Sequence, residues 1–435
     1  METRGQLAGW RSLPVKIAVT LVALLVYRIG ATIPAPGVDP NALVILDHAT
    51  KHGGVLGLLN LLSGGALGNL SICAVGVSAA VVAQMLVQLL GRLIPQLHAG
   101  ADSELGKQQR VNQIQRYLTL VVGVMSGIGL LTYLHHGQLA GTGLSPVPNV
   151  SFWMSSLLVV SWAFGGLIVM WLGELIDQRG VGSGIGVLVL ASVLAGVPGQ
   201  LQAAWATAGI GKFSVMIMVV VVAMVGVIVV DQGQLRLRII YARSGSDSVR
   251  NRSYLPLKIN RAGVLPAIYA MTLTALPPAL AKLLPAHGAL GPVHRFLATS
   301  LSTPGSAGYI VLVFLLILGF SLAFNAATFD ADDVAENLAR NGGYVAGVSP
   351  GPDTANHLER LVHQTGAAGA SLVAVAALVP SVVASLLGIP AFPITGTAVL
   401  ILAVVGIDTV IRLRGEISVE RYRRSARSSG ASLFR

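Results

Sequence analysis

Long apolar stretches alternate with polar segments along almost the whole chain. Ten of these stretches, at about 18–24 residues each, are long enough to cross a bilayer as helices. Because lipid offers the backbone no hydrogen-bond partners, each stretch is predicted to be an α-helix. The predicted spans are residues 15–34, 70–94, 113–135, 152–176, 184–203, 213–232, 262–284, 307–327, 366–389 and 394–413.

Positive charge is concentrated in alternate segments between these stretches. Of the 29 Lys and Arg residues, 24 lie in the N-terminal tail and in the second, fourth, sixth, eighth and tenth segments that follow a span. Lys and Arg are retained on the cytoplasmic side of a membrane, so both termini are predicted to be cytoplasmic.

The number of spans also predicts how the chain is organised. Ten spans divide into five and five, and an odd number of spans in each half places the two halves in opposite orientations. We therefore predict an all-α polytopic membrane protein of ten transmembrane helices in two inverted five-helix halves. The expected parts are a cytoplasmic N-tail at 1–14, a first half at 15–212, a second half at 213–413 and a basic cytoplasmic C-tail at 414–435.

Three connecting segments are long. Two of them, at 231–261 and 328–365, are polar and are predicted to be cytoplasmic loops. The third is the first outer segment, at about 35–68, which contains an apolar piece at 56–67 that is too short to span a membrane. Such a piece is usually re-entrant or interfacial, and its glycines would let it pack inside a helix bundle.

Composition supports a membrane protein and limits its partners. The chain is 54% hydrophobic and 11% charged, whereas soluble domains carry roughly 25% charged residues. The net charge of +11 is better explained by topology and by attraction to anionic lipid than by nucleic-acid binding. The single cysteine, Cys73, excludes an internal disulfide and is predicted to be an inert packing residue.

The residues needed for enzyme or ion-pump chemistry are missing. There is no HExxH or GxxxxGK[ST] motif, and the glycine run at 180–186 follows an apolar helix, where it favours close packing over phosphate binding. We expect no catalytic activity, metal or cofactor. Ionisable residues near the spans lie at their ends, which argues against a proton or sodium relay; they are Arg28, Glu174, Asp177, Lys282, Asp408 and Arg412.

Several short motifs, in order along residues 15 to 425, resemble those of one family. They are Tyr27-Arg28-Ile29-Gly30, Ile33-Pro34-Ala35-Pro36-Gly37, Ser63-Gly64-Gly65-Ala66-Leu67 with Ser71-Ile72, Glu104 with Gln113-Ile114-Gln115-Arg116-Tyr117, Trp171-Leu172-Gly173-Glu174, Arg179-Gly180-Val181-Gly182-Ser183-Gly184, Leu255-Pro256-Leu257-Lys258-Ile259-Asn260, Ala262-Gly263-Val264-Leu265-Pro266, Ala335-Glu336-Asn337-Leu338, Pro350-Gly351 with Thr354, and Gly396-Thr397. In this order, and on the predicted sides of the membrane, they resemble SecY, the central subunit of the Sec protein-conducting channel.

The resemblance implies an hourglass-shaped channel with an apolar ring at its waist. The implied ring residues are Val77, Val81, Ile185, Val189, Ile268 and Ile401. The alternative is that they are ordinary helix-core positions. The segment at 56–67 would be the plug that closes the outer side, with Leu56, Leu59, Asn60, Leu62, Ser63, Gly64, Gly65 and Leu67 as its implied residues. The lateral gate would lie between the second and third helices and the seventh and eighth.

The resemblance also implies partners and a location. They are SecE-like and SecG-like membrane subunits, the SecA motor or the ribosome, polypeptide clients with signal sequences, and anionic lipid, in a prokaryotic cytoplasmic membrane. Cytoplasmic partners would dock at Arg236, Arg238, Arg243 and Ser349. The function implied is passage of unfolded secretory polypeptides across the membrane and lateral release of membrane segments. The alternatives are a secondary transporter of a small solute and a translocon relative that does not conduct.

The chain departs from the family pattern at four places. Ser78-Ala79-Ala80 replaces an early Pro-Tyr in the second helix, and Ser183 replaces an Asn between two glycines. Ser349 replaces an Arg before Pro-Gly, and Asp330-Ala331 replaces an Asn-Pro. These positions lie at the implied gate and motor interface, which leads to the hypothesis of an accessory or divergent family member.

Overall fold

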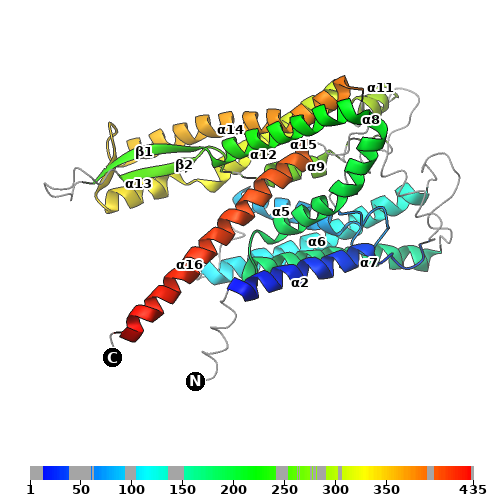
Figure 1. Ribbon diagram of the computed structural model, residues 1–435, viewed down its shortest axis with the longest axis horizontal. Helices are drawn as coiled ribbons and strands as arrows, with labels where there is room; N and C mark the ends of the chain where they lie inside the picture. The colour runs from blue at the N-terminus through cyan, green and yellow to red at the C-terminus, as the bar shows by residue number, and fades with distance from the viewer. Residues whose placement is uncertain are drawn as a thin grey trace. The chain divides into compact units, whose positions relative to one another are not determined.

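The computed structural model describes most of the chain as helices in two compact units (Figure 1). One unit comprises Met1–Phe213, Ile389–Ile394 and Val405–Arg435, and the other comprises Ser214–Gly388 and Thr395–Val404. The described residues are 13–38, 60, 63–93, 104–135, 151–241, 253–261, 263, 265–274, 277, 281, 291–301, 306–388 and 396–432.

The first unit is a bundle of long helices. Its members are α2 (Leu13–Thr32), α5 (Gly76–Leu93), α6 (Glu104–His135), α7 (Phe152–Arg179), the first part of α8 (Gly184–Gln232) and α16 (Gly406–Ser432). The continuous element α8 consists of two helices, because Gly209 has a φ of 69° that no helix allows. Its two parts are Gly184–Ala206 and Gly209–Gln232.

Small residues let the helices of the first unit approach closely. A Cβ atom on Gly76 of α5 would lie 2.9 Å from Val169 of α7, and one on Gly123 of α6 would lie 3.1 Å from the Cα of Ala163. Apolar helices in lipid gain nothing from hydrophobic burial against one another, so close van der Waals packing over small residues holds them together. Helix α7 therefore packs against both α5 and α6.

The outer faces of the bundle are apolar, as a lipid-facing surface requires. Helix α2 buries a single narrow stripe, Ala23, Tyr27 and Ala31, at intervals of four residues. Leu21 and Leu25, on its other side, are about 60% exposed. A soluble helix would carry polar residues there.

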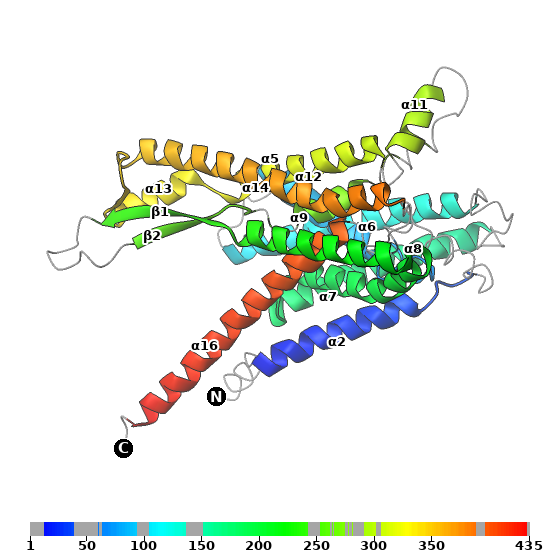
Figure 2. The same ribbon diagram turned by 45° about the horizontal axis from the view of Figure 1, so that its top comes forward.

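The second unit combines membrane-length helices with a small polar end. Its elements are the second part of α8, β1 (Gln234–Tyr241), β2 (Ser253–Lys258), α9 (Leu265–Leu273), α11 (Gly291–Arg295), the π-helix η2 (Phe296–Ser300), α12 (Ala307–Thr328), α13 (Ala331–Arg340), β3 (Gly343–Val345), α14 (Pro352–Leu386), α15 (Gly396–Leu400) and the π-helix η3 (Ile401–Val405). Figures 1 and 2 show β1, β2 and α13 beside one end of α14.

A three-stranded antiparallel sheet, in the order β2-β1-β3, lies within the two segments at 231–261 and 328–365 that were predicted to be loops. The strand β1 reads Gln-Leu-Arg-Leu-Arg-Ile-Ile-Tyr, and its alternation was the available signal for a strand. Leu235 and Leu237 of this strand pack against buried Leu358 and Val362 of α14. The polar segments are therefore a folded platform, although the membrane part is all-α as predicted.

Helix α13 begins at a position where the chain departs from the family pattern. The Asp330 carboxylate accepts hydrogen bonds from the amides of Asp332 and Asp333, at 3.1 and 3.2 Å. Asp is among the best residues for satisfying the free amides of a first helical turn. The Asp330-Ala331 pair thus keeps a strong N-cap.

Within the described residues, seven helices are long and apolar enough to cross a membrane. They correspond to the predicted first, third, fourth, fifth, sixth, eighth and ninth spans. The ninth is much longer than predicted, because α14 begins at Pro352 in the polar end. The second span becomes α-helical only at Gly76, since residues 72–75 form turns. The seventh is described over Leu265–Leu273, and the tenth is helical from Gly396 onward.

We predict that Leu358→Ala loosens the sheet from α14. Leu358 is fully buried beneath the strands, and removing a buried leucine side chain costs about 2–5 kcal/mol. Limited proteolysis of the protein in membranes should then cut the 231–261 segment several-fold faster. Leu372→Ala, at a residue of the same helix that is 54% exposed, is the control and should leave the cleavage rate unchanged. Equal rates for the two variants would contradict the packing role.

Candidate functional site

Four of the six predicted ring residues lie on two helices of the first unit. Val77 and Val81 are one turn apart on α5, and Ile185 and Val189 are one turn apart on α8. A spacing of four residues places each pair on one face of its helix. All four side chains are buried, at 5% exposure or less.

The other two predicted ring residues belong to the second unit. Ile268 lies on α9 and Ile401 begins η3, and both are buried. Helix α9 contacts α15, the short helix that immediately precedes Ile401. The six positions are thus branched aliphatic residues on four different elements. Their assembly into one ring stays a prediction.

The described part of the predicted plug is an irregular segment followed by the start of α5. Leu56, Leu59 and Leu62 lie outside the described residues. Asn60 organises the rest, because its side-chain oxygen accepts a hydrogen bond from the Gly68 amide at 2.7 Å and its carbonyl accepts one from the Gly65 amide at 2.8 Å.

The two glycines of the segment have conformations that other residues avoid. Gly64 and Gly65 have φ angles of 65° and 87°, which glycine adopts without the strain that a side chain would add. A Cβ atom on Gly64 would also lie 2.9 Å from the Cα of Ser192 on α8. Both glycines are therefore needed for the turn, and Gly64 is also needed for the close approach to α8.

The segment is also tied to the chain that follows α2. The Ala35 amide donates to the Leu70 carbonyl at 2.9 Å, and the Ile72 amide donates to the Ile33 carbonyl at 3.1 Å. These two bonds make a short antiparallel bridge around Pro34 and Ser71. Irregular backbone at membrane depth is tolerated only where protein surrounds it, and this bridge supplies part of that surrounding.

Two side chains of α2 hold carbonyl groups of the same segment, and a side chain of α8 bonds to one of them. The Tyr27 hydroxyl of α2 donates to the Ser63 carbonyl at 2.8 Å, and the Arg28 guanidinium donates to the Gly64 carbonyl. The Ser192 hydroxyl of α8 lies 2.8 Å from the Tyr27 hydroxyl. Sequence reasoning missed this group. Tyr27 and Arg28 were used as part of a family motif, and Arg28 also as a charge near a span end, but none of the three residues was predicted to contact the segment.

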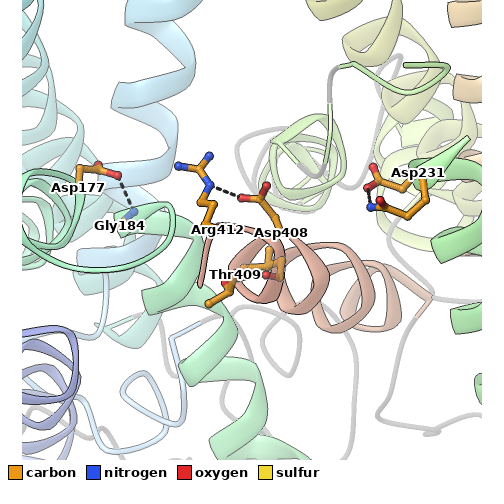
Figure 3. A network of polar contacts seen from close by, with 8 residues as sticks. Asp177, Gly184, Asp231, Asp408, Thr409 and Arg412 are labelled. Atoms are coloured by element: carbon orange, nitrogen blue, oxygen red, sulfur yellow. Dashed lines mark hydrogen bonds and ion pairs between the residues drawn. The ribbon is translucent and has the colours of Figure 1, made fainter. Parts of the chain in front are cut away.

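The turn between α7 and α8 is a second polar cluster of the first unit. Figure 3 shows the Asp177 carboxylate accepting a hydrogen bond from the Gly184 amide, at 2.7 Å, where α8 begins. The Val181 amide of the same turn donates to the Thr20 hydroxyl of α2 at 2.9 Å. A Cβ atom on Gly184 would overlap the Gly173 carbonyl. The predicted packing role of the 180–186 glycine run agrees with this geometry.

Most of the charged residues that the sequence places at span ends have partners. Arg116 of α6 contacts Glu174 of α7 at 2.6 Å, and Arg412 contacts Asp408 within α16 at 2.8 Å, as Figure 3 shows for the second pair. Arg116 and Arg412 are about half exposed, so each pair contributes only about 0–1 kcal/mol. Lys282 lies outside the described residues. The pairs are better suited to fixing helix ends than to a proton relay.

A buried polar cluster of the second unit was not predicted. Asp231, at the end of α8, accepts a hydrogen bond from the Asn260 side chain at 3.0 Å (Figure 3). Next to Asn260, the Arg261 guanidinium lies 4.1 Å from the centre of the Phe329 ring, and burial lowers the pKa of this guanidinium. An arginine stays charged even so. The cluster joins the sheet platform to the start of the seventh span.

The predicted docking residues lie on the polar end of the second unit. Arg236 and Arg238 alternate with buried-side leucines along β1 and are exposed, and Tyr254 of β2 is paired opposite Arg238. Ser349 is exposed, and its carbonyl accepts a hydrogen bond from the Thr354 hydroxyl at 2.7 Å. Arg243 lies outside the described residues.

The described residues contain no group of three His, Cys, Asp or Glu side chains that could hold a metal ion. Their functional features are instead buried aliphatic side chains, a folded-back segment with ordered carbonyl groups, and an exposed basic platform. Together with the apolar helices, these features are typical of a polytopic channel protein.

Comparison with known proteins identifies the family within this class. The SecY family model matches residues 71–410. The protein translocase subunit SecY of Corynebacterium glutamicum is 33% identical over 422 residues, which cover 94% of this chain and 96% of that protein. The SecY of Mycobacterium tuberculosis is 32% identical over 420 residues, which cover 94% and 95%. The chain belongs to the SecY family.

Solved structures of the same fold agree with this assignment. A protein conducting channel superimposes with a TM-score of 0.64 at 16% identity, covering 93% of both chains. A SecY channel whose plug domain stabilises its closed state superimposes with a TM-score of 0.63 at 15% identity, covering 93% and 92%. Sec61 from a canine ribosome–channel complex gives 0.60 at 16% identity, covering 93% of both chains. These likenesses confirm the predicted SecY-like membrane fold, and the chain is a multi-pass membrane protein.

We predict that Gly165→Ala destabilises the first unit. The added Cβ atom would lie 2.0 Å from the Ile72 carbonyl oxygen, so the backbone around the 63–75 segment must move. Overpacking of this kind costs about 1–3 kcal/mol, which exceeds the gain in helix propensity. Thermal unfolding in detergent can be followed by the reactivity of Cys73, the only cysteine, which is buried.

Gly129→Ala on α6 is the matched control for this prediction. No atom lies within 4 Å of a Cβ at Gly129, so the same change should leave the midpoint temperature of thermal unfolding unchanged or raise it slightly. If Gly165→Ala unfolds at the same temperature as the Gly129 variant, the close approach at Ile72 is not needed for stability.

Proposed function

We propose that this chain is the channel-forming subunit of a protein translocase. It would pass unfolded secretory polypeptides across the membrane and release apolar segments laterally into lipid. The observation that carries the proposal is the family match over residues 71–410, within which the predicted ring positions all fall. The chain acts as a conduit and not as an enzyme, with energy supplied by a partner.

The proposed pore ring consists of Val77, Val81, Ile185, Val189, Ile268 and Ile401. Branched aliphatic side chains make a dry constriction, and hydrated ions would lose solvation in passing it. They form no directional bonds, so they can deform around any translocating sequence. Their burial on four separate elements supports this role, because a constriction needs side chains contributed by several helices.

The 56–67 segment would be the plug that closes the outer side of the pore. Its described part is short, irregular and held by hydrogen bonds to α2 and by close contact with α8. The proposed lateral gate would lie between the second and third predicted spans and the seventh and eighth. A signal helix leaving through it would gain about 0.8 kcal/mol for each methylene that enters lipid.

The sheet platform is the proposed docking surface for SecA or the ribosome. Arg236, Arg238 and Arg243 would meet acidic patches of a motor or phosphates of ribosomal RNA. Ser349, exposed on the same polar end, stands where the family usually has an arginine, which supports a divergent motor interface. SecE-like and SecG-like subunits would complete the complex, and the basic C-tail at 414–435 would bind anionic lipid.

The proposed location is a prokaryotic cytoplasmic membrane with both termini in the cytoplasm. The charge pattern supports it, since the two basic tails and the basic 231–261 segment would then share the cytoplasmic side. This topology includes the two predicted five-helix halves, the first at 15–212 and the second at 213–413.

Crosslinking tests the channel directly. A photoactivatable residue at Val81 or at Ile185 should form adducts with a secretory chain stalled during translocation, because both positions would line the path. The control is the same residue at Leu21, which is 60% exposed on α2 and should react with lipid only. A small-solute transporter or a non-conducting relative predicts no polypeptide adduct at any of the three positions. The absence of adducts at Val81 and Ile185 under translocating conditions would contradict the proposal.

A further inference from the structure

The irregular 63–71 segment owes part of its position to three side chains outside it. Tyr27 and Arg28 are neighbours on α2, and they bind neighbouring carbonyl groups, those of Ser63 and Gly64. Each carbonyl belongs to a bend and not to a helix ladder. Inside a membrane protein such a group needs a donor, because water is scarce there.

The third side chain extends this contact to another helix. The Ser192 oxygen lies 2.8 Å from the Tyr27 hydroxyl and 2.9 Å from the Leu188 carbonyl of its own helix. A serine has one hydroxyl hydrogen, so it can serve only one of these acceptors at a time. When it serves Tyr27, a continuous chain of hydrogen bonds runs from α8 through α2 to the segment.

The residues of this hydrogen-bond chain are buried, which makes each bond costly to break. Tyr27 is 2% exposed, Ser192 is 0% exposed and Ser63 is 3% exposed. A buried hydroxyl that loses its partner keeps the full desolvation penalty, since no water replaces the lost bond. The Gly64 backbone also lies against Ser192 with no room for a side chain. The hydrogen bonds and the shape of the contact therefore favour one position of the segment.

We propose that Tyr27, Arg28 and Ser192 form a latch that holds the 63–71 segment against α2 and α8 and sets how readily it is released. The inference rests on the proposed function, in which release of this segment opens the channel. It adds the residues that control release and the direction of their effect: each loss of a latch group favours release.

The segment's position can be read out without a client. Ala66 is fully buried within the segment, so a cysteine at this position reacts with a thiol reagent mainly when the segment is released. Ala66→Cys would be made in a Cys73→Ala background, which removes the native thiol. Labelling rates would be compared in reconstituted vesicles.

Tyr27→Phe and Ser192→Ala should each raise the labelling rate of Ala66→Cys about three- to tenfold, the effect of losing one buried hydrogen bond. Arg28→Gln should raise it about tenfold, because a charged donor is lost. The double variant, Tyr27→Phe with Ser192→Ala, should label only slightly faster than the faster of the two single variants, because Ser192 acts through Tyr27. If the two rate increases instead multiply in the double variant, Ser192 and Tyr27 act independently and the proposed chain of hydrogen bonds is wrong.

Matched controls separate a latch from general loosening. Tyr117→Phe removes a hydroxyl from a tyrosine of α6 that is 73% exposed, and Thr132→Ala removes an exposed hydroxyl that bonds only within α6. Both should leave labelling unchanged. A cysteine at Ala163, buried in α7, should also label at the same rate with and without the Tyr27 change. An equal rise at Ala163 would mean partial unfolding and would overturn the latch.

Ion leakage from the same vesicles separates this inference from the proposed function. If deletion of 56–67 causes leakage but the latch variants change neither labelling nor leakage, the latch is wrong and the channel stands. If the latch variants raise labelling while neither they nor the deletion cause leakage, the segment is latched but closes no channel. The expected result is that labelling and leakage rise together.

Discussion

Every backbone polar group in the membrane part of this protein must find its partner within the protein. This constraint explains why the apolar stretches are helices, and why small residues lie where those helices touch. Gly76 and Gly123 allow neighbouring helices to approach so closely that a methyl group would crowd the facing atoms, and Gly165 allows the same between α7 and the Ile72 backbone. Without that approach, lipid-facing helices would have little reason to associate.

The same constraint gives the irregular segment before α5 its importance. Its carbonyl and amide groups cannot use a helix ladder, so they use Asn60, Tyr27, Arg28 and the bridge at Pro34. A segment held by a few specific bonds is one that a moderate free energy can release. The chemistry that makes the segment costly to leave unpaired also makes it suitable as a movable closure.

The second unit meets a different demand, which is to join apolar helices to a folded polar end. Helix α14 does this by running from Pro352 to Leu386, so that Leu358 and Val362 support the sheet. The later part of the helix is apolar, with one side buried and residues such as Leu372 and Val375 exposed on the other. The Asp330 cap fixes the start of α13, and the buried Asp231–Asn260 pair joins the end of α8 to the chain that follows β2. The exposed basic strand β1 is thereby held against α14.

The sequence by itself determined the class of the protein, because apolar length and the placement of Lys and Arg report directly on the membrane. Most predicted spans correspond to described helices, and the motifs around Tyr27-Arg28-Ile29-Gly30 and Ser63-Gly64-Gly65 pointed to the SecY family that the comparisons confirm. The strands of the platform were visible as alternation in β1 but were overlooked. Only the tertiary structure brought together Tyr27 and Ser192, which are 165 positions apart. The Ser192 hydroxyl bonds to the Tyr27 hydroxyl, which in turn donates to the Ser63 carbonyl. The hydrophobic pattern indicates whether each residue faces lipid, protein or water. Contacts between residues far apart in the chain depend instead on tertiary packing, which a single sequence does not reveal.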